Sequence, residues 1–397
     1  MDSTKPLSRG RALVCVALLV VLGFTLGCSE FIVIGIESQI ADAFGVGLEQ
    51  VGLLISVFAI SYAFLTPVLA LSTGRFKRFT LLIAYSVIFC LGNFLAMVAP
   101  TFGLLVASRV LIGSVSGALL AVGVTYLPEL LGPKKVSLGI SIVYAAFSVA
   151  MVIATSAGKM IAEAWNWHLD MVIVFVLCVV VCLVLVALLP REGATDEPAT
   201  WREQIVLLKQ PCVLLSMAIF TFGVGAIYVF YGYVTPYFED VLGMSSTAAS
   251  AALMGYGAVT FFSNILSGWC DARFGVKSLI PVFIIDAALL FGLYLVSPQM
   301  PMSLALIMLI GLMMYVQSVP CISMFMHTAN KKCPKALTLA SSLEPMSFNI
   351  GIAFGTAVGG LVVAGPGMSH AGLVGGCFSL VALALAVCLL IVNKRSR

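Results

Sequence analysis

Long apolar segments divide this chain of 397 residues almost from end to end. Polar, glycine or proline breaks delimit about twelve of them: 12–36, 50–73, 79–99, 102–126, 136–161, 169–189, 211–235, 246–269, 278–297, 302–326, 336–364 and 371–392. A helix that crosses a bilayer needs about 20 apolar residues. Charged residues make up 10% of the chain, whereas soluble domains carry roughly 25%. We therefore predict an all-α integral membrane protein.

The two halves of the chain repeat each other at a fixed offset of 198 residues, through loops and apolar segments alike. Among the matched pairs are Asp42 with Asp240, Gly45 with Gly243, Arg75 with Arg273, Pro100 with Pro298 and Lys134 with Lys332. We predict two six-helix bundles, over 1–190 and 211–397, joined by a cytoplasmic linker at 191–210 that contains a short interfacial helix at 201–208. Such repeats are typical of transporters that rock two halves around a central site.

Basic residues indicate how the chain is oriented. With twelve spans, almost all lysines and arginines fall on one side of the membrane, and the exceptions are Arg109 and Lys159. Cytoplasmic loops carry the excess of lysine and arginine, so both termini are predicted to be cytoplasmic. The first apolar segment follows a basic stretch, as in a signal peptide. It is too long for one and no cleavage site follows, so we expect it to be retained.

Several short motifs have a recognisable spacing. They are Ser29-Glu30-Phe31 to Gly35, Gly74-Arg75 with Lys77-Arg78, Arg109-x-x-x-Gly113-x-x-x-Gly117, Ser263-Asn264 to Arg273-Phe274-Gly275, and Asn349-Ile350-Gly351 to Gly359-Gly360. Together they resemble drug:proton antiporters of the major facilitator superfamily, most closely the arabinose-efflux-permease-like branch. The resemblance implies a secondary transporter of the inner membrane that exports a small organic molecule, such as a drug, sugar or metabolite, in exchange for protons. It also implies rocker-switch alternating access, with spans one, four and seven at a central cavity.

Departures from the family pattern keep a second function open. Span five has small residues over 154–158 but lacks the proline usual in antiporters, and Ser38, preceded by an unusual Glu37, replaces a usual proline. Proton symport or facilitative uptake of a small metabolite is therefore the alternative. A non-transporting membrane sensor or an enzyme is a remote one, because there is no soluble domain, clustered site or phosphate-binding loop. We expect a small-molecule substrate, protons and the lipid bilayer as partners, no nucleic acid, no cofactor or metal, and a functional monomer.

Three charged residues inside spans have no counterpart in the other half: Glu30, Arg109 and Glu344. A charged side chain within a bilayer is costly, so we expect each of the three to have a function or a structural partner. Glu30 and Arg109 lie roughly 27 Å and 21 Å from the cytoplasmic ends of their spans at 1.5 Å per residue. They form either a proton-coupling pair, released by protonation, or a static ion pair between two helices.

Glu344 lies near the inner end of span eleven, just before Pro345. It is either a second protonation or cation-binding site, or a water-facing carboxylate at the inner mouth. Glu37 lies at the outer end of span one, and we expect it at the surface.

Polar and aromatic side chains in later spans are candidate substrate ligands: Tyr228, Tyr231, Tyr315, Gln317 and Asn349. Tyr228 and Tyr231 lie three residues apart and so share a helix face. An aromatic wall beside a carboxylate suits lipophilic or cationic substrates. The alternative for the tyrosines is an interfacial belt, and for Asn349 a role in helix packing.

Charged residues in the loops after spans two and eight are candidate gates of the inner face: Arg75, Lys77, Arg78, Asp271 and Arg273. They would pair across helices, or the basic ones would only orient the protein in the membrane. Gly113 with Gly117, and Gly351 with Gly355 and Gly359, form small-residue faces expected to let helices approach closely.

Overall fold

The computed structural model describes residues 9–72, 76–131, 136–191, 205–332 and 337–395, and every regular element in these ranges is helical. The long helices are α1 (Arg9–Gly35), α3 (Leu48–Ser72), α4 (Arg78–Met97), α5 (Phe102–Val124), α7 (Val136–Ala164), α8 (Trp167–Leu188), α10 (Pro211–Tyr231), α12 (Ser246–Phe274), α13 (Leu279–Val296), the pair α14 (Met300–Met313) and α15 (Ser318–Lys332), α16 (Leu337–Ala364) and α17 (Ala371–Arg395). Eleven described helical runs are long and apolar enough to cross a membrane, and one, Ser246–Val296, contains both α12 and α13. The predicted all-α membrane fold is confirmed.

Short elements join the long ones. They are α2 (Glu37–Phe44), α6 (Leu127–Leu131), η2 (Val206–Lys209), α11 (Val234–Pro236), the π-helical turn η3 (Tyr237–Val241), η4 (Gly275–Ser278) and η6 (Met368–His370). The first part of the helix predicted at 201–208 lies outside the described residues. In the described part, the chain forms η2 over Val206–Lys209. The division into bundles at 190 and 211 stays a prediction.

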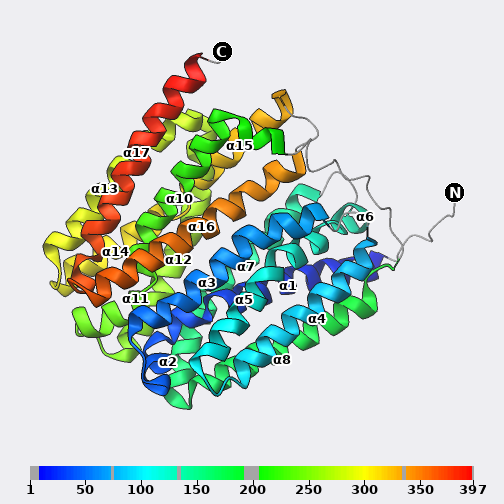
Figure 1. Cartoon of the computed structure of the whole chain (residues 1–397), viewed down its shortest axis with the longest axis horizontal. Coiled ribbons are helices and arrows are strands. Elements are labelled where there is room, and N and C mark those ends of the chain that lie inside the picture. Colours follow the sequence, from blue (N-terminus) through cyan, green and yellow to red (C-terminus); the bar gives the residue numbers. More distant parts are fainter. Residues whose placement is uncertain (1–8, 73–75, 132–135, 192–204, 333–336, 396–397) are drawn as a thin grey trace.

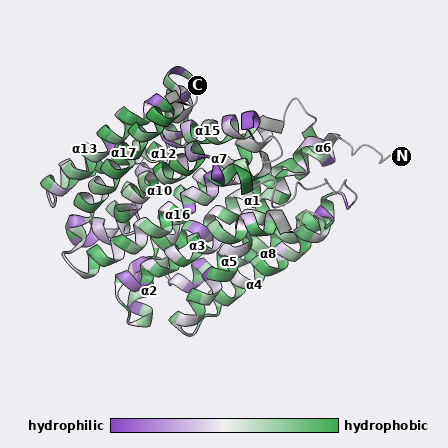
Figure 2. Ribbon diagram, turned by 45° about the horizontal axis from the view of Figure 1, so that its top comes forward, coloured by the Kyte–Doolittle hydropathy of each residue, from purple (hydrophilic) through white to green (hydrophobic). Residues whose placement is uncertain are grey.

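Polar residues cap the N-termini of several membrane-spanning helices. The side chains of Thr101, Asn166 and Ser245 each accept a hydrogen bond from a backbone N–H in the first turn of α5, α8 and α12. These caps satisfy donors that have no partner within the helix. Hydrophilic residues accordingly gather mainly at the ends of the helices, and hydrophobic ones along their lengths (Figure 2).

The internal repeat is visible in the backbone. After α1 the chain bends at Ile36 (φ −123°, ψ 24°), and after α10 it bends at Tyr233 (φ −130°, ψ 26°). Each bend leads into a short helical segment, α2 or α11–η3. Gly45 and Gly243 follow these segments with φ of 61° and 63°, a left-handed conformation that favours glycine. The matched glycines therefore perform the same turn in both halves.

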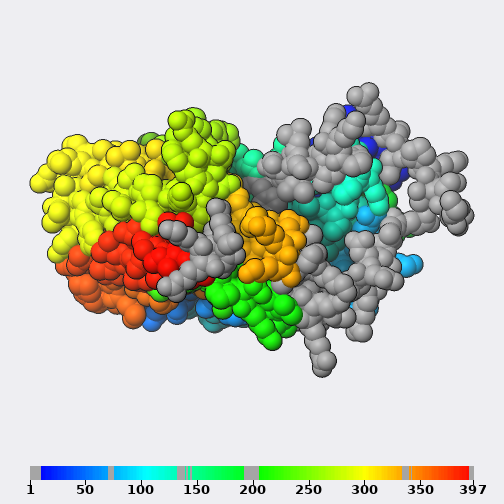
Figure 3. All heavy atoms as spheres, turned by 90° about the horizontal axis from the view of Figure 1, so that it is seen from above, coloured from blue at the N-terminus to red at the C-terminus, as the bar shows by residue number. Residues whose placement is uncertain are grey.

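The two halves of the chain lie side by side (Figures 1 and 3). Their most extensive contacts join α3 to α16 and α7 to α12. Both termini lie at the end of the molecule opposite α2 and α11 (Figure 1). We call the end with the termini the inner end, which the positive-inside rule assigns to the cytoplasm, and the end with α2 and α11 the outer end.

Span ten is broken, although the sequence predicted one continuous segment at 302–326. Pro320 has no N–H to bond the carbonyl of Val316, and the hydroxyl of Ser267 on α12 donates to that oxygen at 2.9 Å. Ser267 also accepts from the N–H of Val319 at 3.0 Å, and Ser263 from that of Tyr315 at 2.8 Å. Serines of α12 thus satisfy the groups freed by the break, as the interior of a membrane protein requires.

Glycines let helices approach closely, as predicted. A Cβ on Gly355 of α16 would lie 2.5 Å from the carbonyl oxygen of Gly225 on α10. Added Cβ atoms on Gly113 and Gly359 would likewise meet the backbone of Phe58 and Val229. Since backbone cannot move aside cheaply, these positions exclude any larger residue.

Gly355→Ala is expected to destabilise the protein by about 1–3 kcal/mol, because the methyl group would force α16 away from α10. The measurement is the midpoint of thermal unfolding in detergent. Gly268→Ala is the control, since a Cβ on Gly268 meets nothing within 4 Å. Equal midpoints for both variants would contradict the close approach.

A candidate substrate cavity lined by carboxylates

A cavity of about 960 Å³ lies between the two halves. Its described walls come from α1, α3, α5 and α7 on one side and from α12, α15 and α16 on the other, together with Tyr315 between α14 and α15. Apart from Glu30 and Phe31, the lining residues belong to the middle or inner parts of their membrane spans. The cavity therefore opens toward the inner end, and Glu30 lies at its deepest part.

Arg109 joins three helices near this deepest point. Its guanidinium donates to the backbone carbonyl oxygens of Ser29 at 2.5 Å and Glu30 at 2.9 Å on α1, and of Leu54 at 3.4 Å on α3. It also lies 4.6 Å from the ring centre of Phe58. The side chain is only 2% exposed, so these carbonyls and the ring are what surround its charge.

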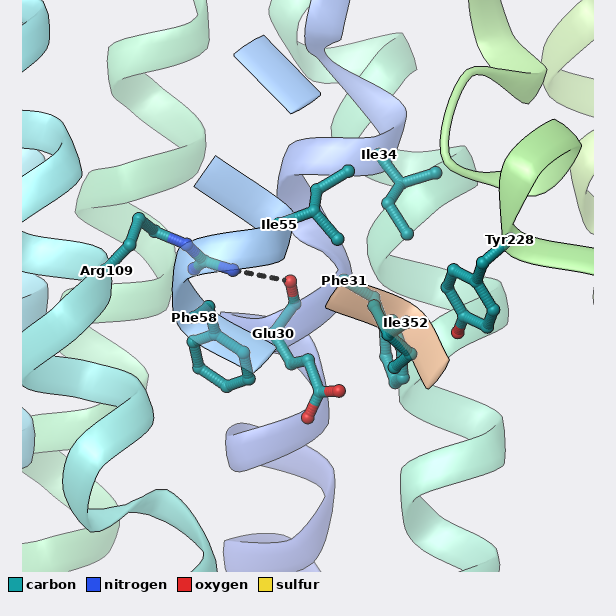
Figure 4. A pocket seen from close by; sticks show the side chains of 8 residues that line it. All are labelled: Glu30, Phe31, Ile34, Ile55, Phe58, Arg109, Tyr228 and Ile352. Carbon is teal, nitrogen blue, oxygen red and sulfur yellow. Dashed lines mark hydrogen bonds between the residues drawn. The ribbon is translucent and has the colours of Figure 1, made fainter. Parts of the chain in front are cut away.

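The predicted ion pair between Glu30 and Arg109 is absent from the described residues. Figure 4 shows the guanidinium bonded to the backbone oxygen of Glu30, while the carboxylate points away from it. Helical side chains tilt toward the start of their helix, and α1 and α5 run in opposite directions. The carboxylate of Glu30 therefore turns toward the inner cavity, where it has no hydrogen-bond or ion-pair partner among the described residues.

Aromatic rings form a layer beside Glu30. Tyr228 lines a small pocket with Glu30 and Arg109, and its buried hydroxyl has no partner among the described residues (Figure 4). Its ring contacts those of Tyr231 and Phe348, with centroids 5.4 and 6.1 Å apart. Tyr231 in turn stacks on Tyr256 at 4.9 Å. Tyr228 and Tyr231 thus contact each other, and Tyr228 lines the small pocket, whereas Tyr231 lines neither this pocket nor the large cavity.

The remaining candidate ligands divide into two groups. Glu344, Tyr315 and Asn349 line the large cavity, and Tyr315 stacks on Phe348 with centroids 5.7 Å apart. The amide nitrogen of Asn349 donates to the carbonyl oxygen of Pro345 on the same helix at 3.0 Å. Gln317 is buried against α10 beside Gly223, away from the cavity lining. Its Oε1 has no partner among the described residues.

None of the predicted inner-face gates joins the two halves among the described residues. Arg78 binds Glu129 at 2.5 Å and lies over the ring of Tyr126, all within the N-terminal half. Asp271 accepts a hydrogen bond of 2.6 Å from Ser323 within the C-terminal half. Lys77 is exposed, Arg273 lies over Trp269 and Phe274 of its own helix, and Arg75 falls outside the described residues.

The two halves are closed at the outer end instead, by contacts that the sequence did not predict. Lys159 of α7 pairs with Glu239 of η3 at 2.5 Å and with Glu163 of its own helix at 2.6 Å. The hydroxyl of Thr235 donates to the carbonyl oxygen of Ile34 at 2.6 Å across the interface. Lys159 was one of the two basic residues that did not fall on the predicted cytoplasmic side. That exception was the one sign in the sequence that Lys159 has a special role. We call these contacts the outer gate.

Glu37 corrects another expectation. It was predicted at the surface, yet it is 0% exposed at the first position of α2. The bend at Ile36 turns α2 against α3 and α11, so the end of span one is covered by the other half of the chain. A residue near the end of a span is exposed only if nothing packs over it.

Comparison with known proteins agrees with this architecture. The sequence matches the family description Major Facilitator Superfamily over residues 19–333 and 226–397. This chain belongs to that superfamily. It is 28% identical over 380 residues to the uncharacterized MFS-type transporter YtbD of Bacillus subtilis (strain 168), a match that covers 96% of each chain.

Solved structures show the same fold. A bacterial homologue of the human lysosomal transporter Spinster, inward-facing and occupied, gives a TM-score of 0.77 at 18% identity over 98% of this chain and 97% of that one. A D-xylose–proton symporter gives 0.74 at 15% identity over 95% and 97%. The chain is therefore a multi-pass membrane transporter of the superfamily. Assignment to the drug:proton antiporter branch stays a prediction.

Lys159→Met is expected to weaken the outer gate, because it leaves Glu163 and Glu239 without their shared cation. The pair is intermediate between surface and buried, so the closed state should lose about 1–3 kcal/mol. The measurement is the rate at which a charged thiol reagent modifies Ser156→Cys, a buried position on α7. Lys77→Met at the inner end is the control, and an unchanged rate in Lys159→Met would contradict the gate.

Proposed function

We propose that this transporter exports small organic cations across the inner membrane in exchange for protons. The observation that carries the proposal is the charge of the cavity: Glu30 and Glu344 line it, and none of its other described lining residues is charged. A cation entering from the cytoplasm would meet two carboxylates in a low-dielectric space.

The cavity walls suit an organic cation better than a hydrated metal ion. Phe31, Tyr62, Phe147, Tyr315 and Phe348 surround the carboxylates. Aromatic faces attract cations and bury apolar groups. About 960 Å³ is at the upper end of the volumes of drug-sized pockets, so a ligand of that size fits with water around it. Export of a drug-like or metabolite cation is thus preferred to export of a neutral sugar.

Proton exchange follows from the state of Glu30. Its carboxylate faces the cavity without an ion-pair partner among the described residues, so a cationic substrate and a proton compete for it. Arg109 stays bound to the carbonyls of α1 and α3 in this arrangement, and its role is to position α1. Protonation from outside would release the substrate, and deprotonation inside would reset the site. Exchange of one monovalent cation for one proton moves no net charge, so the pH gradient drives it: each pH unit supplies about 1.4 kcal/mol, enough for roughly tenfold accumulation.

Uptake by proton symport is the second candidate, and the missing proline at 154–158 of span five favours it. The two functions differ in the direction of proton flow when substrate is added. In inverted vesicles, addition of a substrate cation alkalinises an acid interior under antiport and acidifies it under symport.

Glu30→Gln is expected to reduce proton-driven accumulation of a fluorescent lipophilic cation in inverted vesicles at least tenfold, because the amide neither binds a proton nor attracts a cation. The substitution keeps the shape of the side chain. Transport of the cation is measured at matched protein levels with an imposed acid interior.

Asp42→Asn is the matched control, since Asp42 is an exposed carboxylate on α2 far from the cavity. Wild-type accumulation in Glu30→Gln would remove Glu30 from coupling. Equal accumulation of a neutral analogue by the wild type would remove the preference for cations.

A further inference from the structure

Glu37 occupies an unusual place in the outer gate. It is 0% exposed, and neither oxygen of its carboxyl group has a hydrogen-bond partner among the described residues. An ionised carboxylate is very costly to bury in this way, whereas the neutral acid is much less so. The closed gate therefore favours a protonated Glu37.

The charged groups around Glu37 do not change this conclusion. Lys159 of α7, the cation of the outer gate, is already bound by two carboxylates. The other titratable groups of the surrounding elements are acids and phenols: Glu30 on α1, Asp42 on α2, Glu49 on α3, Glu163 on α7, Tyr231 on α10, Tyr233 before α11, and Tyr237, Glu239 and Asp240 on η3. Burial alone raises the pKa of Glu37 well above its ordinary value.

The internal repeat shows what chemistry this position uses. Thr235 follows Glu37 by the repeat offset of 198 residues, although it lies one residue farther beyond its bend, since the bends at Ile36 and Tyr233 are 197 residues apart. Its hydroxyl donates across the interface to the carbonyl oxygen of Ile34 at 2.6 Å. A protonated carboxyl group carries an O–H donor like that hydroxyl, and a carboxylate carries none. Neutral Glu37 would thus carry an O–H donor of the same kind as that of Thr235.

Glu37 and Glu30 lie on opposite sides of the aromatic layer that contains Tyr228 and Tyr231. They are seven residues apart, Glu30 facing the inner cavity and Glu37 lying within the outer gate. Tyr228 shares a small pocket with Glu30, and its ring contacts that of Tyr231, which lies farther along α10 toward the outer end. Glu30 thus faces the inner side, and Glu37 lies at the outer end.

We propose that Glu37 is a second proton-binding site, which takes up a proton from the outer solution each time the outer gate closes. With the gate open, the carboxylate meets outside water and ionises. Closing requires the carboxylate to accept one proton from a hydronium ion, and reopening returns it. The closed state then holds one more proton than the open state, so a falling outer pH favours closure. The inference deepens the proposed proton exchange, because it adds the step by which an emptied carrier returns inward.

The test is the distance between the outer ends of the two halves as a function of pH. Spin labels on keto-bearing unnatural residues at Ala43 and Gln299, both exposed, leave the native cysteines in place. In the wild type, the ratio of closed to open populations should rise by up to tenfold for each unit of falling pH. Glu37→Gln should remain mostly closed, with a ratio independent of pH. Glu37→Asp should keep a pH-dependent ratio.

Asp42→Asn, on the same helix, is the matched control and should keep the wild-type dependence. A wild type without pH dependence, or Glu37→Gln with the wild-type dependence, would overturn the proposal. Failure of the proposed function is a separate result: proteoliposomes would then show no proton flux when a substrate cation is added, while the dependence of the gate on Glu37 would persist.

Discussion

Arg109 brings a positive charge into the apolar interior of the N-terminal half, and its hydrogen bonds decide how three helices meet. The guanidinium holds carbonyl oxygens of α1 and α3 from its place on α5. Because these acceptors are backbone atoms, the bonds persist whatever the state of the Glu30 side chain. The carboxylate is left free to face the cavity, and the site's chemistry depends on that freedom.

The need to give every buried polar group a partner also explains the other irregular features of the fold. In lipid, a polar group without a partner is costly, so each break in a helix needs groups from a neighbour. The serines of α12 supply them where Pro320 interrupts span ten. Two carboxylates supply them to Lys159 at the outer gate. Glu37 is a buried acid for which the described residues provide no partner, and protonation would remove the large cost of burying its charge.

The closed outer end and the open inner cavity are two consequences of one arrangement. Contacts of α3 with α16 and of α7 with α12 join the halves, and the outer gate adds polar bonds at one end only. The inner ends are then free to separate around the carboxylates. In the transport cycle that we propose, the protein alternates between this state and its opposite, and the charges within the gate set their balance.

The sequence by itself determined the solvent, the helices and the duplication of this protein. Apolar length is sufficient to place a span in a bilayer, and the predicted bounds lie close to those of most long helices. The matched glycines, Gly45 and Gly243, confirmed the repeat because a left-handed turn is a local requirement. Charges inside spans, such as Glu30 and Glu344, could be singled out because burying them is costly wherever the helix lies, and both line the cavity. The tertiary structure alone decided which partner each charge has. It bound Arg109 to carbonyls, paired Lys159 with Glu239 and buried Glu37, since these contacts depend on the direction and proximity of helices far apart in the sequence.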